Sequence, residues 1–132
     1  MNTGYCSFIV KGHGINFKEI EQKLKTEATK IFKEGQITSE VIGKNEFDLI
    51  RFDKEFINES NPNEVLKGLL EQLLPLNSYI EEINNESDVY IKCFLQSNSA
   101  QINFRISPEV MNKIAILGID FEVSILSWGG SK

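Results

Sequence analysis

Residues 61–96, NPNEVLKGLLEQLLPLNSYIEEINNESDVYIKCFLQ, contain the two elements that decide the fold. The first four residues predict a helix start, because they supply a capping asparagine, a proline at the first helical position and a capping-box glutamate. Leucines follow at helical spacing, and Pro75 is expected to bend or restart the helix. From Asp88 apolar and polar residues alternate, which predicts a strand over residues 88–96. The stretch therefore predicts a long amphipathic helix that packs on a sheet.

The elements on the N-terminal side of this stretch are predicted to be a strand, a helix and further strands. Alternation predicts a strand over residues 5–11, and a capped apolar stripe predicts a helix over residues 16–27. Apolar residues on both faces of residues 46–53 indicate an inner strand or one covered by another element. Residues 37–42 predict a weaker strand, while residues 28–35 either extend the helix or form an irregular strand.

The elements on the C-terminal side are predicted to be a second strand, a helix and a closing strand. Residues 101–106 alternate and are expected to pair with residues 88–96 as a hairpin, joined by the turn-forming residues 97–100. A capping serine and a proline at the first helical position predict a helix over residues 107–118, which ends at a glycine. Residues 119–125 then alternate as a closing strand.

The order of these elements predicts an α+β fold with one domain over residues 1–132. Two ferredoxin-like βαβ halves are expected to share an antiparallel or mixed sheet, with helices mainly on one face. The length suits a single domain with its own hydrophobic core. A short flexible tail is expected from about residue 127, in which Trp128 either folds back onto the sheet or contacts a partner.

The charge balance argues against one common class of partner. The 132 residues carry a formal net charge of −5, and most lysines stand beside an acidic residue. A surface that binds nucleic acid needs a dense basic patch that releases counterions. We therefore expect no nucleic acid partner.

The expected cellular location follows from segments that the sequence lacks. Residues 1–11 do not have the layout of a signal peptide, and no apolar run approaches the ~18 residues of a membrane helix. We therefore expect a cytoplasmic protein with no membrane contact.

Cys6 and Cys93 fall on apolar strand faces, which predicts two buried free thiols. A disulfide between adjacent strands and a reactive thiol are the alternatives.

Catalytic and metal-binding patterns are sparse. His13, the only histidine, stands between two glycines in a predicted loop and is expected to be a solvated turn residue. Two strand cysteines and one loop histidine lack the close spacing of zinc ligands. Acidic residues such as Glu81 and Asp88 are expected to be solvated, and no acidic position is expected to be buried. We therefore predict no catalytic residue, no metal and no cofactor, and an enzyme is the less favoured class.

Three segments are similar to one known family. They are the strand CSFIVKG at residues 6–12, ATKIFKEG at residues 28–35, and ISPE at residues 106–109 leading into LGID at residues 117–120. The second is similar to a stretch written P-T-K-x-x-x-K-G. Over about residues 4–126 the chain resembles the bacterial family known as domain of unknown function 4279. The resemblance implies the fold and no particular activity.

The chain departs from the pattern of that family at three places. Ala28 stands where members often have proline, and Leu24-Lys25-Thr26 replaces the usual L-G-I at the end of the first helix. The middle strand lacks the common tryptophan, and Phe47 is nearest to its position. These differences all lie in the first half of the chain.

Four polar residues in or beside the family-like segments are candidate binding residues: Thr29, Lys30, Lys33 and Arg105. Lysine and arginine side chains can hold carboxylates and phosphates. If residues 28–35 cross the open face of the sheet, these side chains would line a groove. Ordinary solvated surface charge is the alternative.

Two functions are compatible with these features. The leading hypothesis is a non-catalytic protein-interaction module that binds through its sheet face or edge, such as an immunity or accessory protein that neutralises a basic partner. The alternative is a domain that binds a small anionic ligand in a groove between helix and sheet, held by Arg105 and Lys30. A deep pocket with converging polar groups would instead favour an enzyme. The chain is expected to be a monomer or a homodimer formed through a sheet edge.

Overall fold

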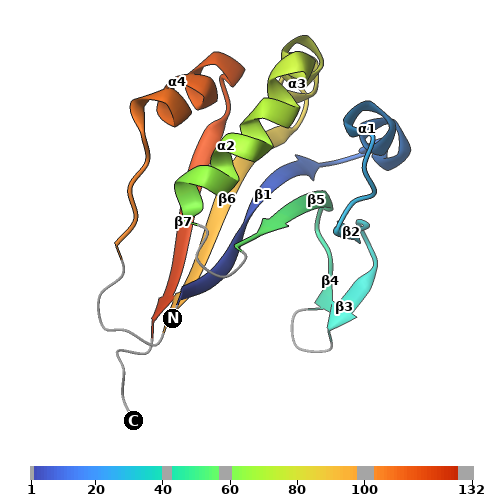
Figure 1. The fold of residues 1–132 in the computed structure, drawn as a ribbon. Coiled ribbons are helices and arrows are strands. Elements are labelled where there is room, and N and C mark those ends of the chain that lie inside the picture. The colour runs from blue at the N-terminus through green and yellow to red at the C-terminus, as the bar shows by residue number, and fades with distance from the viewer. Residues whose placement is uncertain (1, 40–42, 57–60, 98–102, 128–132) are drawn as a thin grey trace.

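A five-stranded sheet with helices on one face forms the body of the protein (Figure 1). The computed structural model describes residues 2–39, 43–56, 61–97 and 103–127. In chain order the elements are β1 (Asn2–Gly12), α1 (Phe17–Leu24), β2 (Lys30–Phe32), β3 (Ile37–Ser39), β4 (Gly43–Lys44), β5 (Asp48–Glu55), α2 (Pro62–Leu73), α3 (Asn77–Asn84), β6 (Asp88–Ser97), α4 (Pro108–Leu117) and β7 (Asp120–Ser127).

The sheet is mixed and has the strand order β2-β5-β1-β6-β7. β1 lies at the centre and pairs antiparallel with β5 and with β6, while β2 pairs antiparallel with β5. β7 runs parallel to β6 at the far edge. β3 and β4 form a separate two-stranded sheet. The predicted α+β fold, with an antiparallel or mixed sheet and helices mainly on one face, is therefore confirmed.

Two crossovers interlock around the central strands. α1 connects β1 to β2 across β5, and the α2–α3 pair connects β5 to β6 across β1. Each connected pair of strands points the same way, so a helix must return the chain along the sheet. Residues of α1, α2, α3 and α4 all belong to one core cluster, and a hydrogen bond of 3.3 Å from Gln72 Nε2 to the Leu24 carbonyl joins α2 to the end of α1. The helices therefore share one side of the sheet (Figure 1).

The predicted caps begin the helices. Asn61 Oδ1 accepts a hydrogen bond of 3.0 Å from Glu64 N, and Ser107 Oγ accepts one of 3.3 Å from Val110 N. Pro75 lies in a short 3₁₀ turn that separates α2 from α3, as expected of a proline that restarts a helix. The buried face of α2 consists of leucines that are at most 1% exposed, namely Leu66, Leu69, Leu70 and Leu73.

The predicted hairpin is wrong. Residues 103–106 form no strand, and β6 pairs with β1 on one side and with β7 on the other. Both edges of β6 are therefore occupied, so it has no free backbone groups for a further strand. Residues 103–107 instead lead into α4, and Ser107 N donates to Asn63 Oδ1 at 2.8 Å. Residues 98–100 of the predicted turn, and residues 101–102 of the predicted strand, lie outside the described residues.

Residues 28–35 lie at one edge of the sheet, where Lys30–Phe32 form β2, and they do not cross its face. α1 ends at Leu24, because Lys25 takes up the left-handed conformation with φ 55°. β2 then pairs in register with β5, so the alternative of an irregular strand is correct. The predicted strand over residues 37–42 is described in part as β3. Its last residues, and Trp128, lie outside the described part of the chain.

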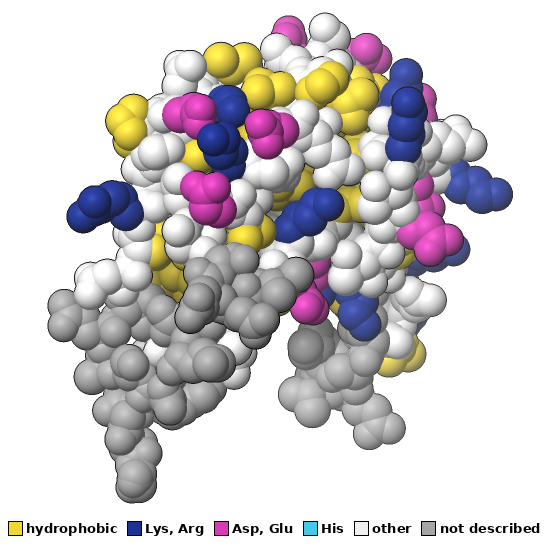
Figure 2. Space-filling view, in the orientation of Figure 1, with side chains coloured by type: hydrophobic (Ala, Val, Ile, Leu, Met, Phe, Trp, Pro, Cys, Tyr) yellow, Lys and Arg dark blue, Asp and Glu magenta, His cyan; other side chains and the backbone are white. Residues whose placement is uncertain are grey.

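The helix side of the molecule has the character of an ordinary solvated surface. Figure 2 shows acidic, basic and apolar side chains interspersed on this side. Lys67 Nζ and Glu109 Oε1 form an exposed ion pair there at 3.3 Å. Among the described helices, none combines the length and the apolar character needed to span a bilayer.

Candidate binding face on the open side of the sheet

The sheet face opposite the helices is built from alternate residues of its strands. On β1, Cys6, Phe8 and Val10 point into the helix-covered core, so Ser7 and Ile9 point the other way. Ser7 is 0% exposed and Ile9 is 4% exposed, although the described helices all lie on the other face (Figure 1). The two are buried because longer side chains of β5 and β6 flank the central strand. We call this side of the sheet the open face.

A polar row crosses the open face along one line of the register. Asp53 of β5 lies opposite Ser7 of β1, which in turn lies opposite Lys92 of β6. Glu122 of β7 lies opposite Lys92 at the end of the row, and Lys92 Nζ is 3.5 Å from Glu122 Oε1. Ser7 Oγ donates a hydrogen bond to Asp53 Oδ1, and Arg51 Nε lies 3.0 Å from the same oxygen. The row therefore holds an ion pair at each end.

The Asp53 carboxylate is nearly shielded from water. Its side chain is 10% exposed, and that of Arg51 is 25% exposed. The contact between them is an ion pair and not an aligned hydrogen bond, because Arg51 Nε–H has no acceptor in line with it. A shielded carboxylate needs a positive partner and a hydrogen-bond donor, which Arg51 and Ser7 supply. Asp53 itself is only partly buried, so the expectation that no acidic position is buried holds for the described residues.

Aromatic side chains flank the polar row. The ring centroids of Tyr5 and Phe94 are 5.4 Å apart, and Arg51 Cζ lies 5.2 Å from the Tyr5 centroid, within cation–π range. Tyr90 lies on the other side of the row and is half-buried. Burial raises the pKa of Tyr90 above its ordinary value, and the charge of Glu122 raises it further. Tyr90 is therefore a neutral hydroxyl at neutral pH.

Three of the four predicted binding residues lie at one edge of the open face. Lys30 lies opposite Arg51 in the β2–β5 pairing and shares its face. Thr29 Oγ1 accepts a hydrogen bond of 2.9 Å from Asp53 N, so this side chain fastens the edge strand to β5. Lys33 is exposed in the loop after β2. Of the three, Lys30 is therefore the one that adds a charged group to the open face.

Arg105 does not join this group. It is exposed in the segment before α4, on the β7 side of the sheet, whereas Lys30 lies on β2 at the opposite edge (Figure 1). The width of the sheet separates the two side chains. They do not form the predicted groove between helix and sheet.

The residues that build the open face were not predicted as a site from the sequence. Arg51 and Asp53 stand two positions apart in one strand, which places both side chains on the same face. That spacing is a usable signal. Ser7 and Lys92 belong to strands far apart in the chain, and no pattern within either strand shows that they are neighbours.

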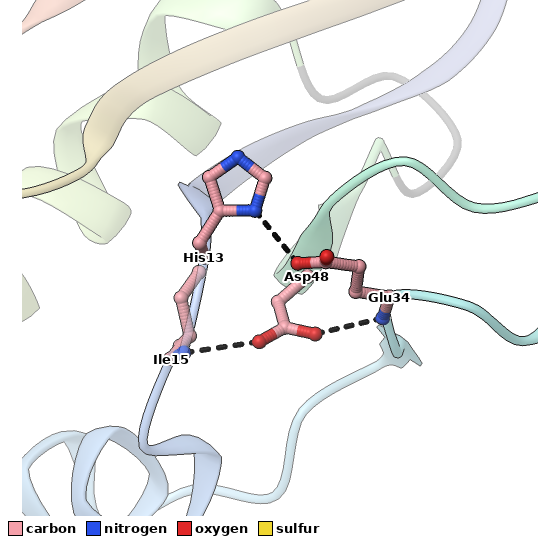
Figure 3. A network of polar contacts seen from close by, with 4 residues as sticks. All are labelled: His13, Ile15, Glu34 and Asp48. Carbon is pink, nitrogen blue, oxygen red and sulfur yellow. Dashed lines mark hydrogen bonds and ion pairs between the residues drawn. The ribbon is translucent and has the colours of Figure 1, made fainter.

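A second polar network fastens the loops at the end of β1 (Figure 3). Asp48 accepts hydrogen bonds from Glu34 N at 2.8 Å and from Ile15 N at 3.0 Å. These backbone donors, Glu34 N first, lower the pKa of Asp48 below its ordinary value. His13 Nδ1 lies 2.6 Å from Glu34 Oε1, and its ring packs on Phe47 at 5.2 Å. Because His13 is 66% exposed, the network ties loops together and does not enclose a reacting group.

The two cysteines lie in the core, on the opposite side of the sheet from the open face. Cys6 and Cys93 are directly opposite each other in β1 and β6, and their Sγ atoms are 2.7 Å apart. Both are free thiols with 0% exposure. The prediction of two buried free thiols is confirmed.

Within residues 2–39, 43–56, 61–97 and 103–127, no group of three or more histidine, cysteine, aspartate or glutamate side chains could hold a metal ion. One open hollow is lined by Lys18, Glu21, Gln22, Lys25, Thr26 and Glu27. Its lining comes from α1 and the turn after it, so it does not bring together groups from different elements as an active site does.

The fold and this face define a class of protein: an α+β domain whose mixed sheet carries helices on one side and an open polar and aromatic face on the other. A family model described as "Domain of unknown function (DUF4279)" matches residues 2–128, nearly the whole chain, and the chain belongs to this family. Comparison with curated proteins and with solved structures finds no match. The resemblance expected from the three segments is confirmed.

Proposed function

We propose that this chain is a non-catalytic protein-interaction module that binds its partner with the open face. One observation carries the proposal: a sheet face without helices bears Tyr5, Tyr90, Phe94 and Arg51 close together. Tyrosine and arginine are enriched among the residues that dominate the binding energy of protein interfaces. An antiparallel face that only meets water usually carries polar residues.

The side chains of the open face are ordered before a partner arrives. Arg51 is held between the Asp53 carboxylate and the Tyr5 ring, and Tyr5 packs on Phe94. Ordering a side chain on binding costs about 0.5–1.5 kcal/mol. Side chains that are already ordered avoid part of this cost, which favours a binding role for this face.

The charges on the open face favour a basic partner. On its β2–β5 side Lys30 and Arg51 are balanced by Asp53 and Glu55. Asp120 and Glu122 on β7 outnumber the neighbouring Lys92, so the β7 side is acidic. Together with the net charge of −5, this distribution would orient a partner with its positive groups over β7. An immunity or accessory protein that neutralises a basic protein fits these features, and a nucleic acid partner does not.

We infer that the protein acts in the cytoplasm. The support is the pair of free thiols of Cys6 and Cys93, whose sulfur atoms lie in contact. Neighbouring thiols persist unoxidised in a reducing compartment.

We also interpret β1, α1, β2, β5, α2–α3 and β6 as a ferredoxin-like core to which α4 and β7 are added. The strand order and the two interlocked crossovers support this interpretation. The added β7 widens the open face by one strand and adds Asp120 and Glu122 to it.

Site-specific cross-linking tests the proposed binding face. A photoreactive phenylalanine analogue replaces Tyr90 on the open face. In a matched control it replaces Met111, which is 53% exposed on α4. We expect one basic protein to be cross-linked through position 90 and not through position 111. Cross-linking through position 111 alone would contradict the proposal.

Binding between the purified proteins provides the quantitative test. Tyr90→Ala is expected to weaken the Kd about 10-fold or more, as loss of a central interface tyrosine does. Met111→Ala is expected to bind like wild type. Circular dichroism checks that both variants are folded. A folded Tyr90→Ala protein that binds the partner with unchanged Kd would overturn the assignment of the open face.

Binding of a small anionic ligand is the second candidate, because Lys30 and Arg51 lie opposite each other on the same face. Arg51 already faces Asp53, so much of its charge is compensated and weak affinity is expected. A thermal-shift titration with phosphate and citrate, on wild type and Lys30→Ala, tests this candidate. Equal shifts of the two proteins would eliminate Lys30 as a ligand-binding residue.

A further inference from the structure

We propose that two copies of this chain pair antiparallel through the outer edge of β7, so that their sheets join into one continuous sheet. The proposal concerns a different surface from the open face and does not depend on the function proposed above. It rests on the length of the β7 edge, on its exposed apolar side chains and on the positions of its charges.

The two edges of the five-stranded sheet differ in length. β2 has only three residues, Lys30–Phe32, and offers a short edge. β7 runs over Asp120–Ser127 and pairs on one side with β6, and along Asp120–Leu126 no described strand pairs on its other side. An edge strand of this length presents a row of backbone donors and acceptors that can bind another strand.

Apolar side chains are exposed along the second half of β7. Val123 is 37% exposed, Ile125 is 52% exposed and Leu126 is 48% exposed. Val123 and Ile125 point to the helix side and Leu126 points to the open face, so both faces of the edge are apolar. Proteins usually protect such an edge with charges or proline, and residues 123–127 contain neither.

The charges of β7 favour one antiparallel register over another for this pairing. When two identical sheets join edge to edge, the two-fold axis is perpendicular to the sheet and residues opposite each other share a face. An axis at Phe121 would place Asp120 opposite Glu122 of the second copy, and like charges in this position are unfavourable. With an axis at Ser124, Val123 of each copy lies opposite Ile125 of the other. Glu122 of each copy then lies opposite Leu126 of the other. The register centred on Ser124 therefore joins apolar residues and separates the acidic ones.

Pairing in this way leaves the open face accessible. Because the axis is perpendicular to the sheet, both copies keep their helices on the same side. The two open faces then lie side by side in one extended surface. Pairing and partner binding can therefore be tested separately.

The mass in solution tests the proposal. Light scattering after size-exclusion chromatography of the full chain is expected to give twice the 15.0 kDa of one chain. Ile125→Lys places a charge on the edge and is expected to reduce the mass to that of one chain. Met111→Lys, at an equally exposed apolar position on α4, is the matched control and is expected to keep the mass of two chains.

Cross-linking then tests the register. Ser124→Cys is expected to join two copies through a short bis-maleimide, because the axis brings the two introduced cysteines together. Ala115→Cys on α4 is exposed as well and is expected to give no joined product. The native thiols of Cys6 and Cys93 are 0% exposed and do not compete. A wild-type mass of one chain at all concentrations, or equal cross-linking of both variants, would overturn the proposal.

Discussion

At the scale of single residues, Arg51, Ser7 and Asp53 form a unit at the centre of the open face. One oxygen of Asp53 receives both the hydrogen bond from Ser7 and the ion pair from Arg51. The carboxylate is 10% exposed, so water can replace little of what either partner provides. Loss of Arg51 or of Ser7 therefore leaves the negative charge of Asp53 poorly compensated.

Arg51→Met is expected to lower the free energy of unfolding by about 1–3 kcal/mol, because it leaves Asp53 nearly buried without its positive partner. The lower half of this range is favoured, since Arg51 is 25% exposed and its charge is partly screened. Urea unfolding at neutral pH measures the change. The double variant Arg51→Met, Asp53→Asn is the control and should be less destabilised than the two single changes together. Simple additivity of the two changes would show that the ion pair has no role in stability.

Asp48 makes the stability of the fold depend on pH. Backbone donors on Glu34 and Ile15 lower its folded pKa below the ordinary 3.8. A lowered folded pKa means that the contribution to stability is complete above the unfolded pKa and is lost as the pH falls through the folded pKa. We expect Asp48→Asn to show a smaller loss of stability than wild type as the pH falls below about 4. Urea unfolding at a series of pH values measures this dependence.

Glu81→Gln is the matched control for the Asp48 experiment, because Glu81 is an exposed carboxylate on α3. It is expected to show the same pH dependence as wild type. If Asp48→Asn and wild type lost stability in parallel through the acid range, the bonds to Glu34 N and Ile15 N would not be the cause.

At the scale of elements, β1 is buried on both of its faces. Its helix-facing residues lie in the core, and Ser7 and Ile9 on its other face lie between the longer side chains of β5 and β6. This explains why Ser7 on one face and Cys6 on the other are both 0% exposed. A central strand of this kind is expected to open only with the whole domain.

The thiols of β1 and β6 are expected to be inert while the domain is folded. The contact with Cys93 and burial both raise the pKa of the Cys6 thiol, and the thiolate is the reactive form. In native buffer Ellman's reagent is expected to react with neither cysteine, and in denaturant with both. Arg51→Met, which destabilises the domain, should react faster than wild type under native conditions. Rapid reaction of either thiol in the stable wild-type protein would contradict the buried pairing.

At the scale of the whole molecule, the order of the strands creates the open face. The polar row takes its members from β5, β1, β6 and β7, which are neighbours in space and not in sequence. The crossovers through α2–α3 and α4 bring these strands together and keep the helices on the other side. A face assembled in this way, with aromatic side chains and an acidic side at β7, suits recognition of another macromolecule better than chemistry on a small substrate.

The sequence by itself determined the local structure. Capping residues and apolar spacing predicted the starts of α2 and α4, the turn at Pro75 and the strands β1, β5 and β6, because these signals act over only a few residues. It also led to the α+β class and the family. Alternation could show that Arg51 and Asp53 share a face, but not which strand lies beside them.

Only the tertiary structure decided which strands pair. Residues 101–106 alternate like a hairpin partner, yet β6 already pairs with β1 and β7 and has no edge left for residues 103–106. The pairing of β2 with β5 likewise places Lys30 beside Arg51. The segment before α4, which contains Arg105, lies at the other side of the sheet. Strand pairing is a non-local choice made by the packing of the whole domain, and so the contacts of the open face could not be predicted from any single segment.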